Sequence, residues 1–243
     1  ESRRNMKKID IHSHILPGID DGSASVEESI AMLKMEAAHG IRHVIATPHF
    51  YANHDTPERF LARRKEAEYI LREEMEKHRG LPQLSVGAEV YFFHGMRHSD
   101  VLSALTIAEK QCILIEMPGV RWSASMYDEL GEIQSRRGLL PIVAHVDRYI
   151  SPLRTHHIPE TLEELPVVVQ ANASFFLRSG TRKMALKMLR REQIHLLGSD
   201  CHNMTSRKPN LAEAIEVIRQ HLGDDVLKQI RYYQDAVLQD ETL

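Results

Sequence analysis

Residues 9–14 read IDIHSH, and residues 197–202, near the other end of the chain, read LGSDCH. In both stretches an apolar run that predicts a buried strand leads into two candidate metal ligands two positions apart: His12 with His14, and Asp200 with His202. Side chains at positions i and i+2 of an extended chain point to the same side. Two ligand pairs carried on strand ends therefore indicate a site for more than one metal ion.

Short apolar runs alternate with helix-like stretches along the chain. The predicted strands are 8–11, 43–46, 84–90, 112–116, 141–144, 167–170 and 194–198, and the predicted helices are 26–39, 57–78, 124–137, 181–191 and 211–222. Repeated β-α units predict a parallel sheet covered by helices. Seven strands favour a barrel or barrel-like closure over an open sheet, although periodicity alone does not decide between them. No linker or repeat divides the chain, which predicts one α/β domain over residues 1–243 with residues 1–6 as a loose lead-in.

Composition limits the classes of function. The 31 basic and 34 acidic residues give a formal charge of −3, so the chain has no general basic field for nucleic acid. Cys112 and Cys201 are the only cysteines, which excludes a disulfide framework and fits a reducing cytoplasm. No apolar run approaches the roughly 18 residues that span a bilayer. We therefore expect a cytoplasmic protein without membrane insertion, and the sequence leaves a homo-oligomer open.

Four further candidate ligands stand where other predicted strands end: His49, Glu89, Glu116 and His145. Taken singly, each has an ordinary alternative as a surface or core residue. The carboxyl ends of strands in parallel α/β folds converge on one face, so the joint pattern predicts one metal site. Imidazoles and carboxylates without thiolates suit manganese, iron, zinc or magnesium.

The motifs together resemble one family. Residues 9–22, IDIHSHILPGIDDG, resemble the start of the bacterial PHP-type (polymerase and histidinol phosphatase) tyrosine-protein phosphatases associated with capsule and exopolysaccharide synthesis. The likeness continues through ATPH at 46–49, GAEV at 87–90, LIE at 114–116, PIVAHVDRY at 141–149 and SDCHN at 199–203. It implies a distorted seven-stranded (β/α) barrel of the PHP type that holds three divalent ions, manganese in preference to iron, zinc or magnesium.

The resemblance also implies a role for each candidate. One ion would be held by His12, His14, Glu89 and Asp200, with Glu89 bridging to a second ion that Glu116 and His145 complete. The third would be held by Asp21, His49 and His202, with Asp20 as the alternative to Asp21. Arg148 and Arg207 would bind phosphate, and Asp21 is also a candidate for proton donation to the leaving group.

The implied reaction is hydrolysis of phosphotyrosine by attack of a metal-bridging hydroxide on phosphorus. A phenol has a pKa of about 10, several units below an aliphatic hydroxyl, so a site without a strong acid favours aryl phosphates. The implied partner is the tyrosine-rich tail of a polysaccharide-assembly kinase. Aromatic residues predicted near the mouth that could stack on the phenyl ring are Tyr51, Phe92, Phe93, Trp122 and Tyr149.

Other functions remain open at this point. Processing of nucleic acid ends, as in polymerase-linked PHP modules, is disfavoured by the balanced charge, and a metal-stabilised binding module would not need so many ligands. The other two alternatives are phosphatases. A small-molecule phosphatase, such as a histidinol phosphatase, would use the same metals on an aliphatic phosphate. A thiol-based phosphatase would use the Cys-x5-Arg spacing of Cys201 and Arg207. The second is disfavoured because residues 202–206 contain no glycine and Asp200 opposes thiolate formation.

Overall fold

All the strands of the computed structural model, which describes residues 8–150 and 157–239, pair in parallel. One sheet has the order β1 (Lys8–Ser13), β2 (Ile41–Ala46), β4 (Gln83–Val86). The other has the order β3 (His49–Phe50), β5 (Glu89–Tyr91), β6 (Cys112–Glu116), β7 (Leu140–Val143), β8 (Val168–Asn172), β9 (Leu196–Gly198). The predicted lead-in at residues 1–6 lies outside the described residues.

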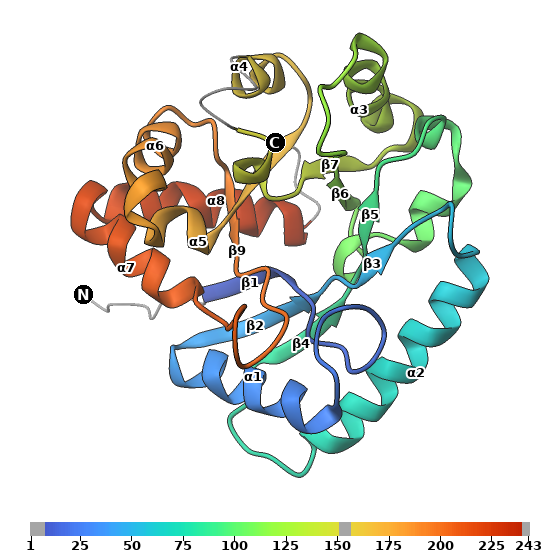
Figure 1. The fold of residues 1–243 in the computed structure, drawn as a ribbon, viewed down its shortest axis with the longest axis vertical. Coiled ribbons are helices and arrows are strands. Elements are labelled where there is room, and N and C mark those ends of the chain that lie inside the picture. Colours follow the sequence, from blue (N-terminus) through green and yellow to red (C-terminus); the bar gives the residue numbers. More distant parts are fainter. Residues whose placement is uncertain (1–7, 151–156, 240–243) are drawn as a thin grey trace.

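The two sheets form one curled surface (Figure 1). The chain runs from β2 into β3 and from β4 into β5, and an isolated parallel bridge joins Ser13 to Cys201 beyond β9. The backbone N–H of His14 donates to the carbonyl of Cys201 at 2.8 Å. The predicted parallel α/β architecture is confirmed, whereas the described strands do not form one continuous seven-stranded ring.

The prediction of a single strand over 84–90 is wrong, because this segment is divided between the two sheets. The neighbouring strand is interrupted at Pro48, which has no N–H to donate. There the backbone N–H of Gly87 bonds to Ala46 (2.8 Å), and that of Glu89 bonds to Pro48 (3.0 Å). A Cβ at Gly87 would lie 3.0 Å from the Cα of Ile107, so this close approach favours glycine. The kink carries Glu89 into the second sheet.

Helices cover the outside of the curl (Figure 1). The predicted helices are confirmed as α1 (Val26–Ala38), α2 (Pro57–Met75), α3 (Ala124–Arg137), α6 (Ser179–Arg190) and α7 (Leu211–Leu222). Sequence reasoning missed α4 (Ile158–Glu163), α5 (Ala173–Leu177) and α8 (Asp224–Gln239), as well as the short 3-10 helices Met96–His98, Asp100–Ala104, Ile107–Glu109 and Val146–Arg148. Ser25 caps α1 by accepting from the N–H of Glu28, and Gly138 ends α3 with φ 66°. Within the described ranges no helix has both the length and the apolar character that crossing a bilayer requires.

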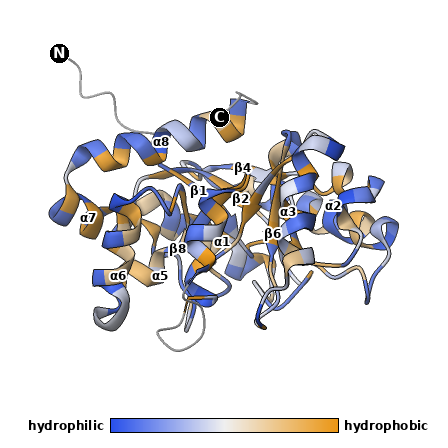
Figure 2. Ribbon diagram, turned by 90° about the horizontal axis from the view of Figure 1, so that it is seen from above, coloured by the Kyte–Doolittle hydropathy of each residue, from blue (hydrophilic) through white to orange (hydrophobic). Residues whose placement is uncertain are grey.

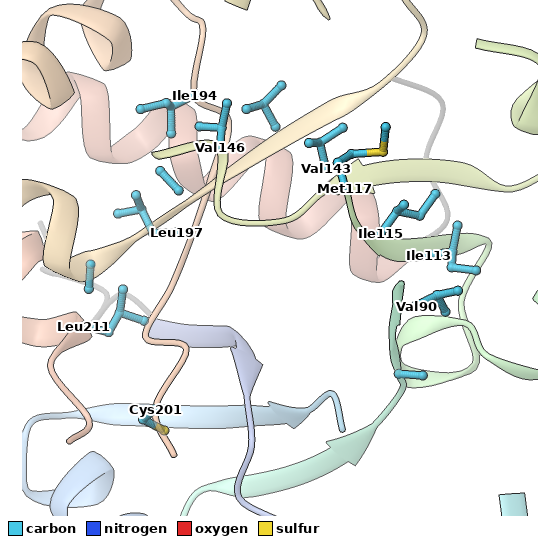
Figure 3. Close-up of a cluster of buried hydrophobic side chains, with 14 of the residues drawn as sticks. Val90, Ile113, Ile115, Met117, Val143, Val146, Ile194, Leu197, Cys201 and Leu211 are labelled. Carbon is cyan, nitrogen blue, oxygen red and sulfur yellow. The ribbon is translucent and has the colours of Figure 1, made fainter. Parts of the chain in front are cut away.

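Alternate strand residues belong to two hydrophobic clusters. Ile113 and Ile115 of β6 lie in the larger cluster (Figure 3), whereas Leu114 between them lies in a smaller one with Ile142 of β7. Because successive side chains of a strand point to opposite faces, the smaller cluster fills the inside of the curl and the larger one packs under the helices.

Helix α8 covers the amino-terminal ends of the strands. It lies along one side of the molecule (Figure 2), and its Val237 belongs to the inner cluster. The Gln234 amide donates to the carbonyl of Ile9 in β1 at 3.0 Å. The carboxyl-terminal ends of the strands are therefore the ends available for a site.

Two carboxyl groups meet in the core beneath β1. Glu36 of α1 is 1% exposed, and neither of its oxygens has a hydrogen-bond partner. One of its carboxyl oxygens lies within 4.8 Å of a carboxyl oxygen of Asp10 and of Sγ of Cys201, both fully buried. Burial, reinforced by the Asp10 carboxylate, raises the pKa of Glu36 to about 10. Glu36 is therefore protonated at neutral pH. Burial also raises the pKa of Asp10, although hydrogen bonds from Ser199 and His12 oppose this shift.

This predicts that Glu36→Gln stabilises the protein at neutral and alkaline pH. Unfolded glutamate ionises near pH 4.5 and folded Glu36 near pH 10. The wild type therefore loses stability between these values relative to the variant, by at most about 1.4 kcal/mol per pH unit. Urea unfolding at pH 4, 7 and 9 measures the difference, which should vanish at pH 4. Glu27→Gln, on the exposed side of the same helix, is the control and should give no such gain. If the difference in free energy of unfolding were the same at all three pH values, Glu36 would ionise in the folded protein as it does in the unfolded one.

Candidate metal centre

The predicted ligands meet at the carboxyl ends of the strands. They come from β1 and the loop after it, β3, β5, β6, the turn after β7 and the segment after β9: His12, His14, Asp21, His49, Glu89, Glu116, His145, Asp200 and His202. The distances between their ligand-type atoms divide them into three overlapping groups.

The first group contains His12, His14, Glu89 and Asp200. The Nε2 atoms of His12 and His14 each lie 3.2 Å from Oε2 of Glu89, and 3.6 and 3.4 Å from Oδ1 of Asp200. The two Nε2 atoms are themselves 3.2 Å apart. Nitrogen lone pairs this close to each other and to two carboxylates suit a shared cation.

The second group is built on the other side of Glu89. Nε2 of His145 lies 2.7 Å from Oε1 of Glu89 and 3.6 Å from Oε1 of Glu116. His49 also reaches this group, since its Nδ1 lies 3.1 Å from Oε2 of Glu89 and 3.6 Å from Oε2 of Glu116. Oε2 of Glu89 thus faces His12 and His14 of the first group, whereas Oε1 faces His145 of the second, as in a bridging carboxylate.

The third group lies toward the β1–α1 loop. Oδ1 of Asp21 is 3.5 Å from Nε2 of both His49 and His202. Asp20 instead accepts a hydrogen bond from the backbone N–H of His49 at 3.0 Å, and its Oδ2 lies 2.8 Å from Nδ1 of His14. The geometry favours Asp21 as the ligand and Asp20 as the residue that orients two histidines.

Opposite charges balance the buried centre. Burial alone would lower the pKa of His12, but Glu89 and Asp200 raise it above its ordinary value. Burial alone would raise the pKa of Glu89, but His12 and His145 hold it well below its usual range. By contrast, burial, assisted by His14, lowers the pKa of His202 to about 3. Protons on some histidines thus occupy the place of metal charge, and metal binding would release them.

Unpartnered atoms test whether a cation fits. Buried polar atoms almost always have hydrogen-bond partners. Four atoms that face other candidate ligands make no hydrogen bond: Nδ1 of His49, Oε2 of Glu89, Oε2 of Glu116 and Nε2 of His202. The donor set therefore fits divalent cations. His145 and Asp200 also have positive φ (31° and 52°), a strained backbone of the kind held at functional sites.

Strand β8 supplies supporting residues that sequence reasoning missed. Oε1 of Gln170 accepts from the backbone N–H of His145 (2.6 Å) and lies 3.2 Å from Nδ1 of His12. The Asn172 amide donates to Oδ2 of Asp200 at 2.8 Å. The available signal was the pair of polar residues at i and i+2 that interrupts an otherwise apolar strand.

Two arginines line the solvent side of the centre. Nη2 of Arg148 lies 2.5 Å from Oδ2 of Asp200, and Nη2 of Arg207 lies 2.7 Å from Oδ1. Their side chains are 38% and 36% exposed. A phosphate group entering from solvent could therefore reach both guanidinium groups, whose forked N–H donors match its oxygens.

Three of the five aromatic side chains predicted to contact the substrate are buried. Phe92, Trp122 and Tyr149 are 5–7% exposed, and the Tyr149 hydroxyl accepts from the backbone N–H of Met117 at 2.8 Å. The prediction that they stack on a substrate is therefore wrong. Tyr51 is half-buried, and its ring centroid lies 5.3 Å from that of His49, so it is the best placed of the predicted aromatic residues.

The thiol alternative fails on burial. Cys201 is fully buried, and burial, with Asp10 and Glu36 nearby, raises the pKa of its thiol well above the ordinary value. A thiol without access to substrate and with so little thiolate cannot act as the nucleophile.

Comparisons with known proteins agree with the fold and the motifs. A family model described as capsular polysaccharide synthesis, CpsB/CapC, matches residues 8–238. The chain belongs to the CpsB/CapC family. It is 28% identical over 232 residues to the tyrosine-protein phosphatase CpsB of Streptococcus agalactiae, covering 91% of this chain and 94% of the relative. It is 27% identical over 253 residues to the tyrosine-protein phosphatase YwqE of Bacillus subtilis, covering 97% and 93%.

A solved structure shows the same fold. The comparison is with a structure from a crystallographic study of YwqE of Bacillus subtilis and CpsB of Streptococcus pneumoniae, described there as unique metal-dependent tyrosine phosphatases. The TM-score is 0.83 at 23% identity, and 97% of this chain and 96% of the other are covered. The curled parallel sheet is therefore shared over nearly the whole length of both chains.

The supporting role of β8 gives a prediction. Gln170→Leu removes the acceptor that faces His12 and His145, so affinity for divalent metal should fall by about 10- to 100-fold, as for other residues that orient ligands. Titration of the metal-stripped protein with manganese or zinc measures this. Gln83→Leu, at the exposed start of β4, is the matched control and should bind as the wild type does. Equal affinities in all three proteins would show that Gln170 does not orient the ligands.

Proposed function

We propose that this protein is a metal-dependent protein-tyrosine phosphatase. The observation that carries the proposal is the convergence of nine imidazole and carboxylate side chains, Glu89 among them, beneath two solvent-accessible arginines. The names of the similar proteins, CpsB and YwqE, support phosphotyrosine as the substrate. The small-molecule alternative, histidinol phosphate, has no comparable support.

The proposed cofactor is a set of three divalent ions, manganese in preference to iron, zinc or magnesium, at the carboxyl ends of the strands. The three groups of ligands are those described above, with His49 placed between the second and the third. When bound, the ions would lower the pKa of a coordinated water, so that hydroxide is available to attack phosphorus near neutral pH. The mixture of imidazole and carboxylate donors supports such ions.

Protein side chains would bind and orient the phosphate. Arg148 and Arg207 both contact Asp200, and each has further N–H donors that can turn toward phosphate oxygens. Their positive charge would offset the negative charge that spreads over the equatorial oxygens during phosphoryl transfer. Asp20 would hold His14 and His49 in place by its hydrogen bonds.

The leaving group explains a preference for aryl esters. Phenolate, with a conjugate acid of pKa about 10, departs with little proton donation, unlike an aliphatic alkoxide. Asp21, whose side chain is 66% exposed, is the proposed donor where one is needed. The site therefore suits phosphotyrosine better than phosphoserine.

The proposed physiological substrate is the tyrosine-rich tail of a polysaccharide-assembly kinase in the cytoplasm. The family's description, capsular polysaccharide synthesis, supports the link to this process. A disordered tail can present its tyrosines one at a time to a site at the mouth of the curled sheet.

The metal mechanism predicts which substitutions abolish activity. Asp200→Ala, or removal of metal with a chelator, should reduce hydrolysis of a phosphotyrosine peptide by more than the roughly 100-fold that loss of a supporting residue costs. Cys201→Ser should retain most of the activity. Release of inorganic phosphate measures the rates. If Cys201→Ser is inactive while the chelated enzyme works, the proposed mechanism is wrong.

The proposed role of Arg148 is tested by a substitution that keeps the positive charge but removes the paired N–H donors of the guanidinium group. Arg148→Lys should lower kcat/KM for phosphotyrosine peptide by about 10-fold or more, since a hydrogen bond to a charged group contributes about 1.5–3 kcal/mol. Arg136→Lys, on the exposed face of α3, is the control and should leave kcat/KM unchanged. Unaltered kinetics of Arg148→Lys would mean that only the charge matters.

A further inference from the structure

A pocket of about 520 Å³ opens beside the metal centre. We call it the flank pocket; besides Asp20, Asp21 and His49, its lining residues are Ile19, Tyr51, His54, Asp55, Arg59 and Arg63. It shares Asp21 and His49 with the third ligand group. Any group that fills it therefore lies next to a substrate whose phosphate is bound at the centre.

The inner wall of the flank pocket is aromatic. The ring centroid of Tyr51 lies 5.3 Å from that of His49 on one side and 5.9 Å from that of His54 on the other. These rings lead from the metal centre to the start of α2. A peptide advances about 3.3 Å per residue, so residues only a few positions from a bound phosphotyrosine would reach that end of the pocket.

The outer end of the flank pocket has an excess of positive charge. Arg63 is held in place, because it pairs with Asp55 at 2.5 Å and donates to the carbonyl of Ile19 at 3.0 Å. Arg59 makes only a longer contact to the same carboxylate, 3.5 Å, and its side chain is 73% exposed. Two guanidinium groups thus share one carboxylate, and Arg59 is the one available to a ligand.

The acidic residues at the inner end do not cancel this charge. Asp20 is paired with His14 at 2.8 Å, and Asp21 faces the imidazoles of His49 and His202 at 3.5 Å. Both carboxylates are thus directed at the metal centre, while the arginines stand at the opposite end of the pocket.

We propose that the flank pocket binds acidic residues next to the phosphotyrosine of a peptide substrate, and that Arg59 selects them. This inference rests on the proposed phosphatase function and specifies its substrate class. The aromatic wall packs against the peptide between the phosphotyrosine and the acidic side chain. Arg59 then pairs with that side chain near the surface, where an ion pair contributes modestly and is weakened by salt.

The test uses one phosphotyrosine peptide sequence in two forms. One form has glutamate and the other has lysine at the positions within a few residues of the phosphotyrosine, on both sides. For the wild type, kcat/KM should be about 2- to 5-fold higher for the glutamate peptide at low salt, and the ratio should approach one at high salt. Arg59→Glu should bring the ratio of the two kcat/KM values to one or below one. Arg42→Glu is the control. It introduces the same charge change near the amino-terminal end of β2, away from the carboxyl ends of the strands where the site lies, and should keep the wild-type ratio.

The outcomes separate the inference from the proposed function. If both peptides are hydrolysed but the wild type and Arg59→Glu show equal ratios, the flank pocket does not select acidic residues, and the phosphatase function stands. If Arg42→Glu changes the ratio as much as Arg59→Glu, the preference comes from net charge and the assignment to Arg59 is wrong. If neither peptide is hydrolysed while a small phosphate ester is, the proposed function fails, and the inference fails with it.

Discussion

The buried carboxylate of Glu89 is the constraint on which the site and the curl of the sheet depend. It is fully buried, yet it carries its charge at the meeting point of four imidazoles: His12, His14 and His49 lie 3.1–3.2 Å from Oε2, and His145 lies 2.7 Å from Oε1. An unpaired charge in such a place would cost several kcal/mol. These imidazoles come from β1, the loop after it, β3 and the turn after β7, so only a curled sheet can bring them to one carboxylate.

A second set of contacts holds the two ends of the chain together. Asp10 of β1 accepts from the backbone N–H of Ser199 at 2.9 Å and, more weakly, from that of His12 at 3.3 Å. Backbones approach closely there, since a Cβ at Gly198 would lie 2.6 Å from the Cβ of His12. The carboxylate of Asp10 thus fixes the position of the His12–His14 pair relative to the Asp200–His202 pair. It does so where the described strands of the two sheets are joined by the Ser13–Cys201 bridge.

Much of this arrangement follows from local sequence, and the exceptions have physical causes. The candidate ligands could be located because strand ends and i, i+2 spacing are local properties, and α3 and α7 have the predicted bounds. The division of segment 84–90 could not be predicted, since it depends on Pro48 in a neighbouring strand. Gln170 and Asn172 have the same i, i+2 spacing, but they were missed because an amide is a poor metal ligand and its role appears only when its hydrogen bonds to His145 and Asp200 are seen. The burial of Trp122 and Tyr149 depends on loops packing over them, which periodicity does not describe.

Asp200 connects the candidate metal centre to the two arginines that we propose bind phosphate. Its two oxygens face Nε2 of His12 and His14 on one side and Nη2 of Arg148 and Arg207 on the other. A carboxylate that gives its electron density to a cation becomes a weaker partner for guanidinium groups, which are then freer to turn toward phosphate. Because such coupling is reciprocal, phosphate that draws the arginines away would leave Asp200 a better metal ligand. The same carboxylate would therefore make metal and substrate bind more tightly together than either does alone.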